Sequence, residues 1–225
     1  MELYKLDTHV HTAETSRCGK VDAVDVVRIY KEAGYDGIFI TDHYCKEFFD
    51  ALEGMSWEEK IDQYLRGYRL ARDEGERIGL QVFLGIEIRF EENANDYLVY
   101  GVNEDFLREN EELYQLDVPR FKELIKDRDI LIFQAHPFRP EMVRKHLSLL
   151  AGLEVYNGNP RQHSQNLMAY ACARENKLKM LSGTDFHQVY DLDTRGGVEI
   201  SERIEKPEDF VALVRQDRIV RLIQS

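Results

Sequence analysis

The chain has 225 residues, of which 43% are hydrophobic and 32% are charged. This length and balance predict a single domain over residues 1–225 with a sizeable core, and they exclude a globally disordered chain. The 30 basic and 42 acidic residues give a net charge of −12, which argues against binding to duplex nucleic acid, because such binding needs many phosphate-neutralising cations.

Short apolar runs alternate with longer amphipathic ones along the whole chain. The short runs predict strands over residues 3–7, 36–41, 80–88, 97–102, 130–134, 152–156, 178–182, 197–200 and 218–222. The amphipathic runs predict helices over residues 23–33, 56–78, 118–127, 140–150, 164–176 and 207–217. Residues 103–117 are acidic and polar, and we expect a surface excursion with a short helix there. This alternation is typical of an α/β protein with a mostly parallel sheet.

Histidine and carboxylate side chains gather at the ends of these predicted strands. Five of the seven histidines follow a strand and one glutamate ends one, and the set is His9, His11, His43, Glu87, His136 and His187. The gaps between successive groups can each hold a helix and a return strand, since a βαβ unit takes roughly 30 residues or more. Parallel strands bring their C-terminal ends to one rim, so these side chains can converge there.

Two short motifs add local geometry to this pattern. In the His-x-His motif at 9–11 an extended backbone points both imidazoles to one side, and the Asp-x-His motif at 185–187 repeats this with an oxygen and a nitrogen ligand. Imidazole and carboxylate together suit Zn, Mn or Fe. The candidates outnumber the ligands of one tetrahedral ion, which predicts two or three divalent metal ions that share bridging carboxylates. We expect Asp42 to orient His43.

Five motifs in chain order resemble those of the polymerase and histidinol phosphatase (PHP) superfamily. They are Asp-Thr-His-Val-His (7–11), Ile-Thr-Asp-His (40–43), Gly-Ile-Glu-Ile (85–88), Ala-His-Pro (135–137) and Gly-Thr-Asp-Phe-His (183–187). The resemblance spans residues 3 to about 190 and is specific for the superfamily rather than for one member. It implies a distorted seven-stranded (β/α) barrel, similar to a TIM barrel, with the metal cluster at its C-terminal rim. It also implies phosphoester hydrolysis, with metal ligands carried over by position: His9, His11, His43, Glu87, His136, Asp185 and His187.

Two places depart from the superfamily pattern. Many members have a further histidine after the glutamate motif, where this sequence offers Asp96 as an oxygen ligand. The loop after His11 often supplies another ligand, commonly histidine. Here Glu14 could ligate, Arg17 could bind substrate, and Cys18 is interpreted as a small buried residue. These departures leave the choice between two and three ions open.

The proposed cluster predicts specific catalytic roles. Two closely spaced cations lower the pKa of a bridging water and generate hydroxide at neutral pH, and they also stabilise the leaving oxygen. Bridging requires a carboxylate, and we assign this role to Glu87. His43, Asp185, His187 or a metal-bound water could protonate the leaving alkoxide, and the sequence does not decide among them.

Arginines near the predicted rim are candidates for binding a phosphate group, since guanidinium pairs with phosphate in a bidentate manner. Arg17 lies in the first loop, Arg89 lies two residues beyond Glu87, and Arg139 follows the Ala-His-Pro motif. Arg161 is a further candidate. Other polar residues have weaker assignments: Arg195 is a minor substrate candidate, Glu154 is supporting or structural, His163 is near the rim, and His146 is superficial.

The expected partner is a small phosphorylated substrate, either a phosphomonoester or a nucleotide or oligonucleotide phosphate. No apolar run approaches the roughly 20 residues that cross a bilayer, so we expect no membrane partner. Three cysteines cannot form a complete disulfide framework, and the N-terminus lacks a signal-peptide pattern, which together predict a cytoplasmic location. The oligomeric state stays open.

Two other functions compete with a phosphoesterase. Amidohydrolases also carry His-x-His after the first barrel strand, but those with two metals commonly use a bridging lysine midway round the barrel, where this chain has Glu87. A metal-binding domain that has lost catalysis is the second alternative, and the nearly complete ligand set argues against it.

Overall fold

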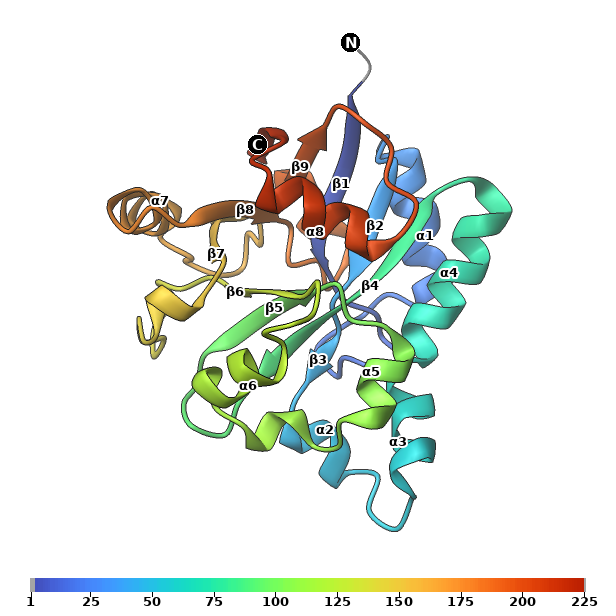
Figure 1. Cartoon of the computed structure of the whole chain (residues 1–225). Helices are drawn as coiled ribbons and strands as arrows, with labels where there is room; N and C mark the ends of the chain where they lie inside the picture. The colour runs from blue at the N-terminus through green and yellow to red at the C-terminus, as the bar shows by residue number, and fades with distance from the viewer. Residues whose placement is uncertain (1–2, 225) are drawn as a thin grey trace.

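The computed structural model describes residues 3–224, which form one mixed sheet with helices packed around it (Figure 1). A path of nine strands runs in the order β10-β9-β1-β2-β4-β5-β6-β7-β8, and β3 pairs with β4 beside this path. The strands are β1 (Tyr4–Val10), β2 (Gly37–Ile40), β3 (His43–Tyr44), β4 (Gln81–Arg89), β5 (Asp96–Tyr100), β6 (Leu131–Gln134), β7 (Gly152–Asn157), β8 (Lys179–Gly183), β9 (Gly196–Ile200) and β10 (Ile219–Gln224). Val10 forms a parallel bridge with Phe186, which follows β8, so the barrel-shaped sheet is nearly closed.

The strand pairing is mixed rather than mostly parallel. β1 with β2, β2 with β4, β3 with β4, β6 with β7, and β7 with β8 are parallel, whereas β5 and β9 pair antiparallel with both of their neighbours. The turn at residues 90–95 explains β5, because it is too short for the crossover that parallel strands need. The path itself has nine strands, so the expected count of seven is not confirmed.

Eight α-helices and three short 3₁₀ helices connect the strands within residues 3–224. The α-helices are α1 (Ala23–Glu32), α2 (Lys46–Asp50), α3 (Trp57–Tyr64), α4 (Arg66–Ile78), α5 (Glu104–Glu109), α6 (Val118–Leu124), α7 (Asn166–Glu175) and α8 (Pro207–Arg215), and the 3₁₀ helices are Leu113–Gln115, Leu147–Leu149 and Val189–Thr194. In this part of the chain no helix combines the length and the apolar character needed to cross a membrane.

The helix expected over 56–78 is split at Leu65 into α3 and α4. Gly67 in the first turn of α4 lies directly against the segment that follows His11, and a Cβ there would clash with Thr12 and crowd Asp42. Glycine permits this close approach, which seats α4 behind the strand ends that carry the histidines.

Apolar side chains fill the barrel interior beneath those strand ends. Phe210 of α8 contacts Phe39 and Tyr100, with ring centroids 4.7 and 5.3 Å apart. Leu6 and Leu181 belong to the same buried cluster. Leu6 precedes His9 along β1, and Leu181 precedes the Asp-x-His motif after β8. The interior is thus a packed core, and polar residues are confined to one end of it.

The helix predicted over 140–150 does not form. The Asn95 side chain accepts a hydrogen bond from Val143 N (2.8 Å) and donates one to Val143 O (2.7 Å), and Gln134 Nε2 donates to the same oxygen (2.9 Å). His146 has a left-handed φ of 56° that interrupts a helix. Side chains of distant residues therefore take the hydrogen-bonding groups of a segment whose own pattern looks helical.

The segment 103–117 is more buried than expected. It contains α5 and a 3₁₀ turn, but Phe106, Leu107, Leu113 and Tyr114 are buried in the same apolar cluster as α3 and α6. The acidic residues between these positions face outward and hide the apolar pattern. The expected short helix is confirmed as α5, but the expectation that the segment is a surface excursion was wrong.

Candidate metal centre

The predicted metal ligands converge at the end of the barrel where β1, β4, β6 and β8 finish. Four groups of three have ligand atoms within 4.8 Å of one another: His9, His11 and Asp185; His9, Glu87 and His136; His11, His43 and His187; and His43, Glu87 and Asp96. The structure therefore brings together the seven ligands carried over by position and Asp96, although they lie on separate segments of the chain.

Strand β1 places two imidazoles side by side. Val10 is fully buried in the apolar cluster against α1. Because successive side chains of a strand point to opposite faces, His9 and His11 both face away from α1 and into the barrel mouth. Their ring centroids are 5.1 Å apart. Both rings are buried, with 0% and 1% of the residue exposed.

Glu87 is the centre of the cluster. Its Oε1 lies 3.2 Å from His9 Nε2 and 3.1 Å from His136 Nε2. Its Oε2 lies 2.7 Å from His43 Nδ1 and 3.4 Å from His11 Nε2. The pairing of β3 with β4 sets His43 directly beside Glu87. One carboxylate thus faces four imidazoles, which is the arrangement expected of a bridging ligand.

Asp185 occupies the other side of the same space. Its Oδ1 lies 3.4 Å from His9 Nε2 and 3.3 Å from His11 Nε2, and its Oδ2 accepts a hydrogen bond from Arg139 at 2.6 Å. Its backbone has a left-handed φ of 54°, which is uncommon outside glycine and turns the carboxylate toward β1.

Buried polar atoms without partners test whether a metal fits this cluster. Among residues 3–224, His9 Nε2, His11 Nε2 and His136 Nδ1 are buried and make no hydrogen bond. Such groups are rare in native proteins and indicate an ion or water at the site. The two Nε2 atoms face the carboxylates of Glu87 and Asp185, and this nitrogen-and-oxygen donor set fits divalent metal binding and suits Zn, Mn or Fe.

The charge states of the cluster also fit metal binding. Burial alone would raise the pKa values of Glu87 and Asp185, but neighbouring positive groups, with His9 foremost, hold both well below their usual range. Burial lowers the pKa of His11, and the nearby His187 and His43 lower it further. Glu87 and Asp185 are therefore anionic and His11 is neutral, as metal ligation requires. The neighbouring carboxylates raise the pKa of His9 and of His43, so these two imidazoles must release a proton when they bind a metal.

Hydrogen bonds to the far nitrogens fix how the first two imidazoles are presented. His9 Nδ1 donates to Glu154 Oε1 (2.9 Å). His11 Nδ1 donates to Ser16 Oγ (3.0 Å), because that hydroxyl gives its own hydrogen to Asp42 (2.7 Å). In the neutral ring each bond leaves Nε2 with a free lone pair toward the cluster, which is how proteins orient metal-binding histidines.

This arrangement corrects the role expected for Asp42. The carboxylate does not contact the His43 ring, and instead it accepts from Thr12 N and Oγ1 (2.8 and 2.7 Å) and from Ser16 Oγ. Ser16 Oγ in turn accepts from His43 N at 3.1 Å. Asp42 therefore holds the loop after β1 and reaches His11 through Ser16, a residue that the sequence analysis did not identify.

Asp7 and Tyr30 form a second supporting network that the motifs did not reveal. Asp7 accepts from Tyr30 OH (2.8 Å) and from Thr184 N and Oγ1 (3.1 and 2.6 Å). Burial raises the pKa of Asp7 to about 6. The network ties β1 to the segment that carries Asp185. The only signal in the sequence is a tyrosine at the apolar face of an ordinary amphipathic helix.

The predicted substrate arginines differ in how they are engaged. Arg89 binds Asp96 through two bonds (2.8 and 2.9 Å), and Arg161 binds the buried Asp191 in the same way (3.0 and 2.9 Å). Arg139 donates a hydrogen bond to Asp185 Oδ2 (2.6 Å). Arg17 is exposed and has no ion pair among the described residues. The Arg89 pair also occupies both oxygens of Asp96, whose nearer oxygen lies 3.9 Å from His136 Nε2.

Two interpretations of the loop after His11 were wrong. The Glu14 carboxylate accepts hydrogen bonds from Ala23 N (2.9 and 3.1 Å), so it caps the N-terminus of α1 instead of joining the cluster. Cys18 is exposed rather than buried, and its Sγ lies 3.1 Å from His187 Nε2. His163 and Arg195 are exposed. His146 is partly buried near Glu92 (3.8 Å) and lies outside any α-helix.

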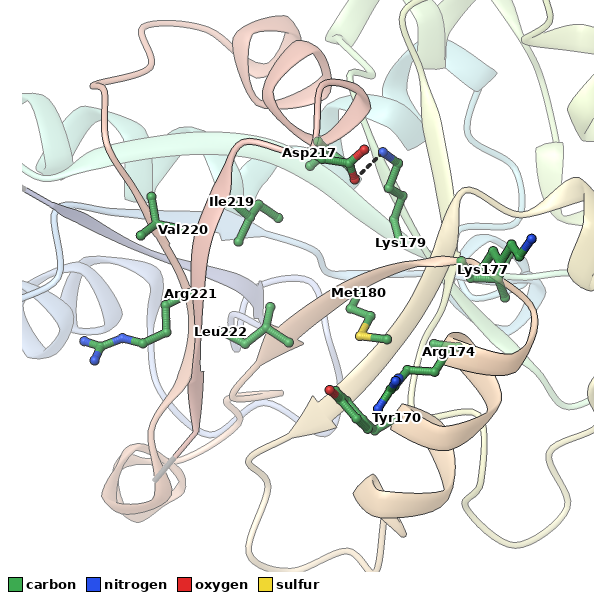
Figure 2. A pocket seen from close by; sticks show the side chains of 13 residues that line it. Tyr170, Arg174, Lys177, Lys179, Met180, Asp217, Ile219, Val220, Arg221 and Leu222 are labelled. Carbon is green, nitrogen blue, oxygen red and sulfur yellow. Dashed lines mark hydrogen bonds and ion pairs between the residues drawn. The ribbon is translucent and has the colours of Figure 1, made fainter.

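A cavity of about 630 Å³ lies away from this cluster, between α7, β8 and β10 (Figure 2). Met180 and Leu222 form part of its apolar lining, and Lys179 pairs with Asp217 at its edge. Lys179 begins β8, whereas the candidate ligands Asp185 and His187 follow the end of that strand. The cavity is therefore a separate feature, and none of the predicted ligands lines it.

No protein-family model and no curated protein sequence matches the chain. Solved structures do match it. A two-domain protein from Bacteroides vulgatus, containing a predicted PHP-like metal-dependent phosphoesterase, matches with a TM-score of 0.67 and 20% identity. The match covers 93% of this chain and 62% of that protein, so the chain spans less than two thirds of its length.

Two further structures match over nearly their whole length. One, from Bifidobacterium adolescentis, is described as a metal-dependent phosphoesterase (TM-score 0.54, 16% identity, 96% of each chain). The other is an amidohydrolase from Chromobacterium violaceum with bound sulfate and no metal (TM-score 0.53, 14% identity, 96% of this chain and 97% of that one). At these identities the matches show that the chain shares the fold of these proteins.

Proposed function

We propose that the chain is a metal-dependent phosphoesterase that hydrolyses a small phosphomonoester or a nucleotide or oligonucleotide phosphate. The observation that carries this proposal is the position of Glu87 among four imidazoles, with buried ligand atoms on both sides that make no hydrogen bond. The neighbour with a predicted PHP-like phosphoesterase supports the hydrolase class.

The residues of the cluster divide naturally around Glu87. His9, His11 and Asp185 would hold one ion, and His136 would hold a second with Glu87 shared between them. When bound, divalent ions supply Lewis-acid chemistry, since they neutralise phosphoryl oxygens and make water a better nucleophile at neutral pH. Manganese, zinc and iron are the metals that suit these ligands.

Arg17 and Arg139 are the arginines best placed to bind the phosphate group. Arg17 is exposed, lies in the loop after His11 and pairs with no carboxylate in the part of the chain that the structure describes. Arg139 already contacts Asp185 through Nη2 (2.6 Å), so a phosphoryl oxygen at the cluster would meet a fixed guanidinium. Arg89 and Arg161 are held by buried or nearly buried carboxylates, and we assign them to shaping the rim.

A proton for the leaving oxygen can come from the outer imidazoles. The His43 side chain is 27% exposed, the most of any candidate ligand, and His187 follows at 9%. Both lie on the side of the cluster that faces solvent. Because a general acid must reach the leaving group, we assign this role to these two histidines rather than to the buried His9 or His136.

Hydrolysis of p-nitrophenyl phosphate by the manganese-loaded protein tests the proposal. We expect turnover that is abolished in His9→Ala and Asp185→Ala and retained in His163→Ala, whose imidazole is exposed outside the cluster. Folded protein that binds metal but hydrolyses no phosphoester from a broad panel would contradict the proposal and favour a domain without catalysis.

An amidohydrolase is the second candidate, because one structural neighbour carries that description. Glu87 at the bridging position distinguishes this chain from two-metal amidohydrolases that use lysine there. Activity on lactams or amides without activity on phosphoesters would favour an amidohydrolase over a phosphoesterase. A cytoplasmic location, and the lack of a duplex nucleic acid or membrane partner, stay predictions.

A further inference from the structure

The cavity between α7, β8 and β10 lies at the seam of the barrel, away from the metal centre (Figure 2). Strands β8 and β10 are the two ends of the sheet path, and they do not pair with each other in the part of the chain that the structure describes. Near the metal centre, Ser182 Oγ donates to Ile223 O (2.5 Å) across the seam. At the opposite end, Lys179 Nζ donates to Arg215 O (3.1 Å) and pairs with Asp217 (2.5 Å). Side-chain contacts therefore span the seam at both ends of the cavity.

Partly exposed apolar side chains form the floor of this cavity. Leu178 and Met180 lie at the start of β8, and Ile219 and Leu222 belong to β10. Tyr170 of α7 completes the floor and is 42% exposed. Ligand pockets are clefts of roughly 300–1,000 Å³ with a largely apolar lining, and this cavity of about 630 Å³ falls in that range. Most of the floor is unbranched or branched aliphatic surface, which suits an aliphatic chain.

The lining of the cavity is positively charged, although the whole chain carries a net charge of −12. Four cations and one carboxylate line it: Arg174, Lys177, Lys179, Arg221 and Asp217. Lys179 is paired with Asp217, and Arg221 is paired with Glu199 (2.8 Å). Arg174 and Lys177 pair with no carboxylate among residues 3–224. The Arg174 guanidinium lies 6.0 Å from the centre of the Tyr170 ring, at the edge of the apolar floor (Figure 2).

We propose that this cavity binds a small carboxylate with an aliphatic chain, with the carboxylate on Arg174 and the chain over Met180 and Leu222. A guanidinium holds a carboxylate through two parallel hydrogen bonds, and Arg174 has no protein carboxylate to compete for them. The described residues that line the cavity include no candidate metal ligand. This site is therefore separate from the metal centre and does not depend on phosphoester hydrolysis.

Calorimetric titration of the protein with decanoate tests the head group and the chain separately. EDTA is present throughout, so that the carboxylate cannot bind a metal at the histidine cluster. We expect decanoate to bind about tenfold more tightly than octanoate, because two more methylene groups are buried. Decan-1-ol has the longer chain without the charge, and it should bind at least about tenfold more weakly than decanoate.

The variant Arg174→Gln should weaken decanoate binding at least about tenfold and leave the binding of decan-1-ol unchanged. Arg120→Gln is the matched control, because this arginine of α6 is exposed and does not line the cavity. It should bind decanoate like the wild type. Equal affinities for decanoate and decan-1-ol, or wild-type affinity in Arg174→Gln, overturn the proposal.

Nuclear magnetic resonance of isotope-labelled methionine methyl groups locates the bound chain. Decanoate should shift the Met180 resonance, which the variant Met180→Leu assigns, and should leave the resonance of Met55 in place. Met55 is 42% exposed and does not line the cavity. The absence of decanoate binding, or binding that leaves the Met180 resonance unchanged, overturns the proposal. Neither result affects the metal centre, since metal binding is measured on the same protein without decanoate.

Discussion

Glu87 Oε1 lies 3.2 Å from His9 Nε2, although their strands β4 and β1 are separated in the sheet by β2. The contact is made where the strands converge at one end of the barrel. It places the Glu87 carboxylate between His9 and His11 at the end of β1 and His136 after β6. Removal of this single side chain should therefore affect both halves of the cluster.

The variant Glu87→Gln is expected to bind divalent metal far more weakly. Glutamine keeps the shape but lacks the negative charge that faces four imidazoles. Changes to outer residues of metal sites cost about 10–100-fold in affinity, so loss of the central carboxylate should cost more than about 100-fold. Equilibrium dialysis with elemental analysis measures this, and the exposed Glu175→Gln serves as the matched control. Unchanged metal content would show that Glu87 is not the central ligand of the metal site.

The variant Glu154→Gln tests an outer residue. Glu154 accepts from His9 Nδ1 (2.9 Å) and from His136 N (2.9 Å), so it orients ligands from both halves of the cluster. We expect zinc affinity to fall by about 10–100-fold with the fold retained. Competition with a chromophoric chelator gives the affinity, and circular dichroism checks the fold. An affinity equal to that of the wild type would show that this hydrogen bond does not support a ligand.

Metal removal is expected to lower thermal stability. A ligand that binds only the folded state at 100 times its dissociation constant adds about 2.7 kcal/mol. Differential scanning calorimetry should show a lower Tm after chelation, restored by zinc or manganese. His9→Ala should lose most of this response while His163→Ala keeps it. The same response in both variants would indicate that the stabilising ions bind elsewhere.

Glu74 should make part of the stability depend on pH. Hydrogen bonds from Arg77 and then Arg28 (2.7 Å each) lower the pKa of its carboxyl to about 2 in the folded protein. A depressed folded pKa stabilises the protein above the unfolded pKa, and the contribution fades as pH falls toward the folded value.

The variant Glu74→Gln is therefore expected to be less stable than the wild type at neutral pH, with a difference that shrinks as pH falls from about 5 to 3. Urea titrations at several pH values measure this. A difference that is constant over the range would show that the two Glu74 ion pairs, one within α4 and one from α4 to Arg28 of α1, do not act through charge.

Much of the metal centre could be predicted because its signals are local. The His-x-His pair lies in extended backbone, which points both imidazoles to the same side. The extended geometry expected for the Asp-x-His pair was wrong, because Asp185 has a left-handed φ of 54°. The supporting residues could not be predicted. Ser16 and Tyr30 act through contacts with Asp42 and Asp7, and such pairings depend on how distant segments meet rather than on spacing.

In the fold, too, the features set by local sequence patterns could be predicted, and those set by distant contacts could not. Most strands and helices lie close to their predicted ranges, since apolar periodicity reflects burial directly. The stretch 140–150 has a helical pattern, but the Asn95 and Gln134 side chains bind the backbone N and O atoms of Val143, which lies outside any helix. The segment around Tyr114 was misread for the opposite reason, because its acidic neighbours mask residues that are buried by tertiary contacts.

Anomalous X-ray diffraction from crystals grown with zinc or manganese would locate the bound ions. We expect one strong peak between Glu87, His9 and Asp185 and another beside His136. Peaks confined to surface carboxylates, with these side chains bonded only to one another, would contradict this expectation.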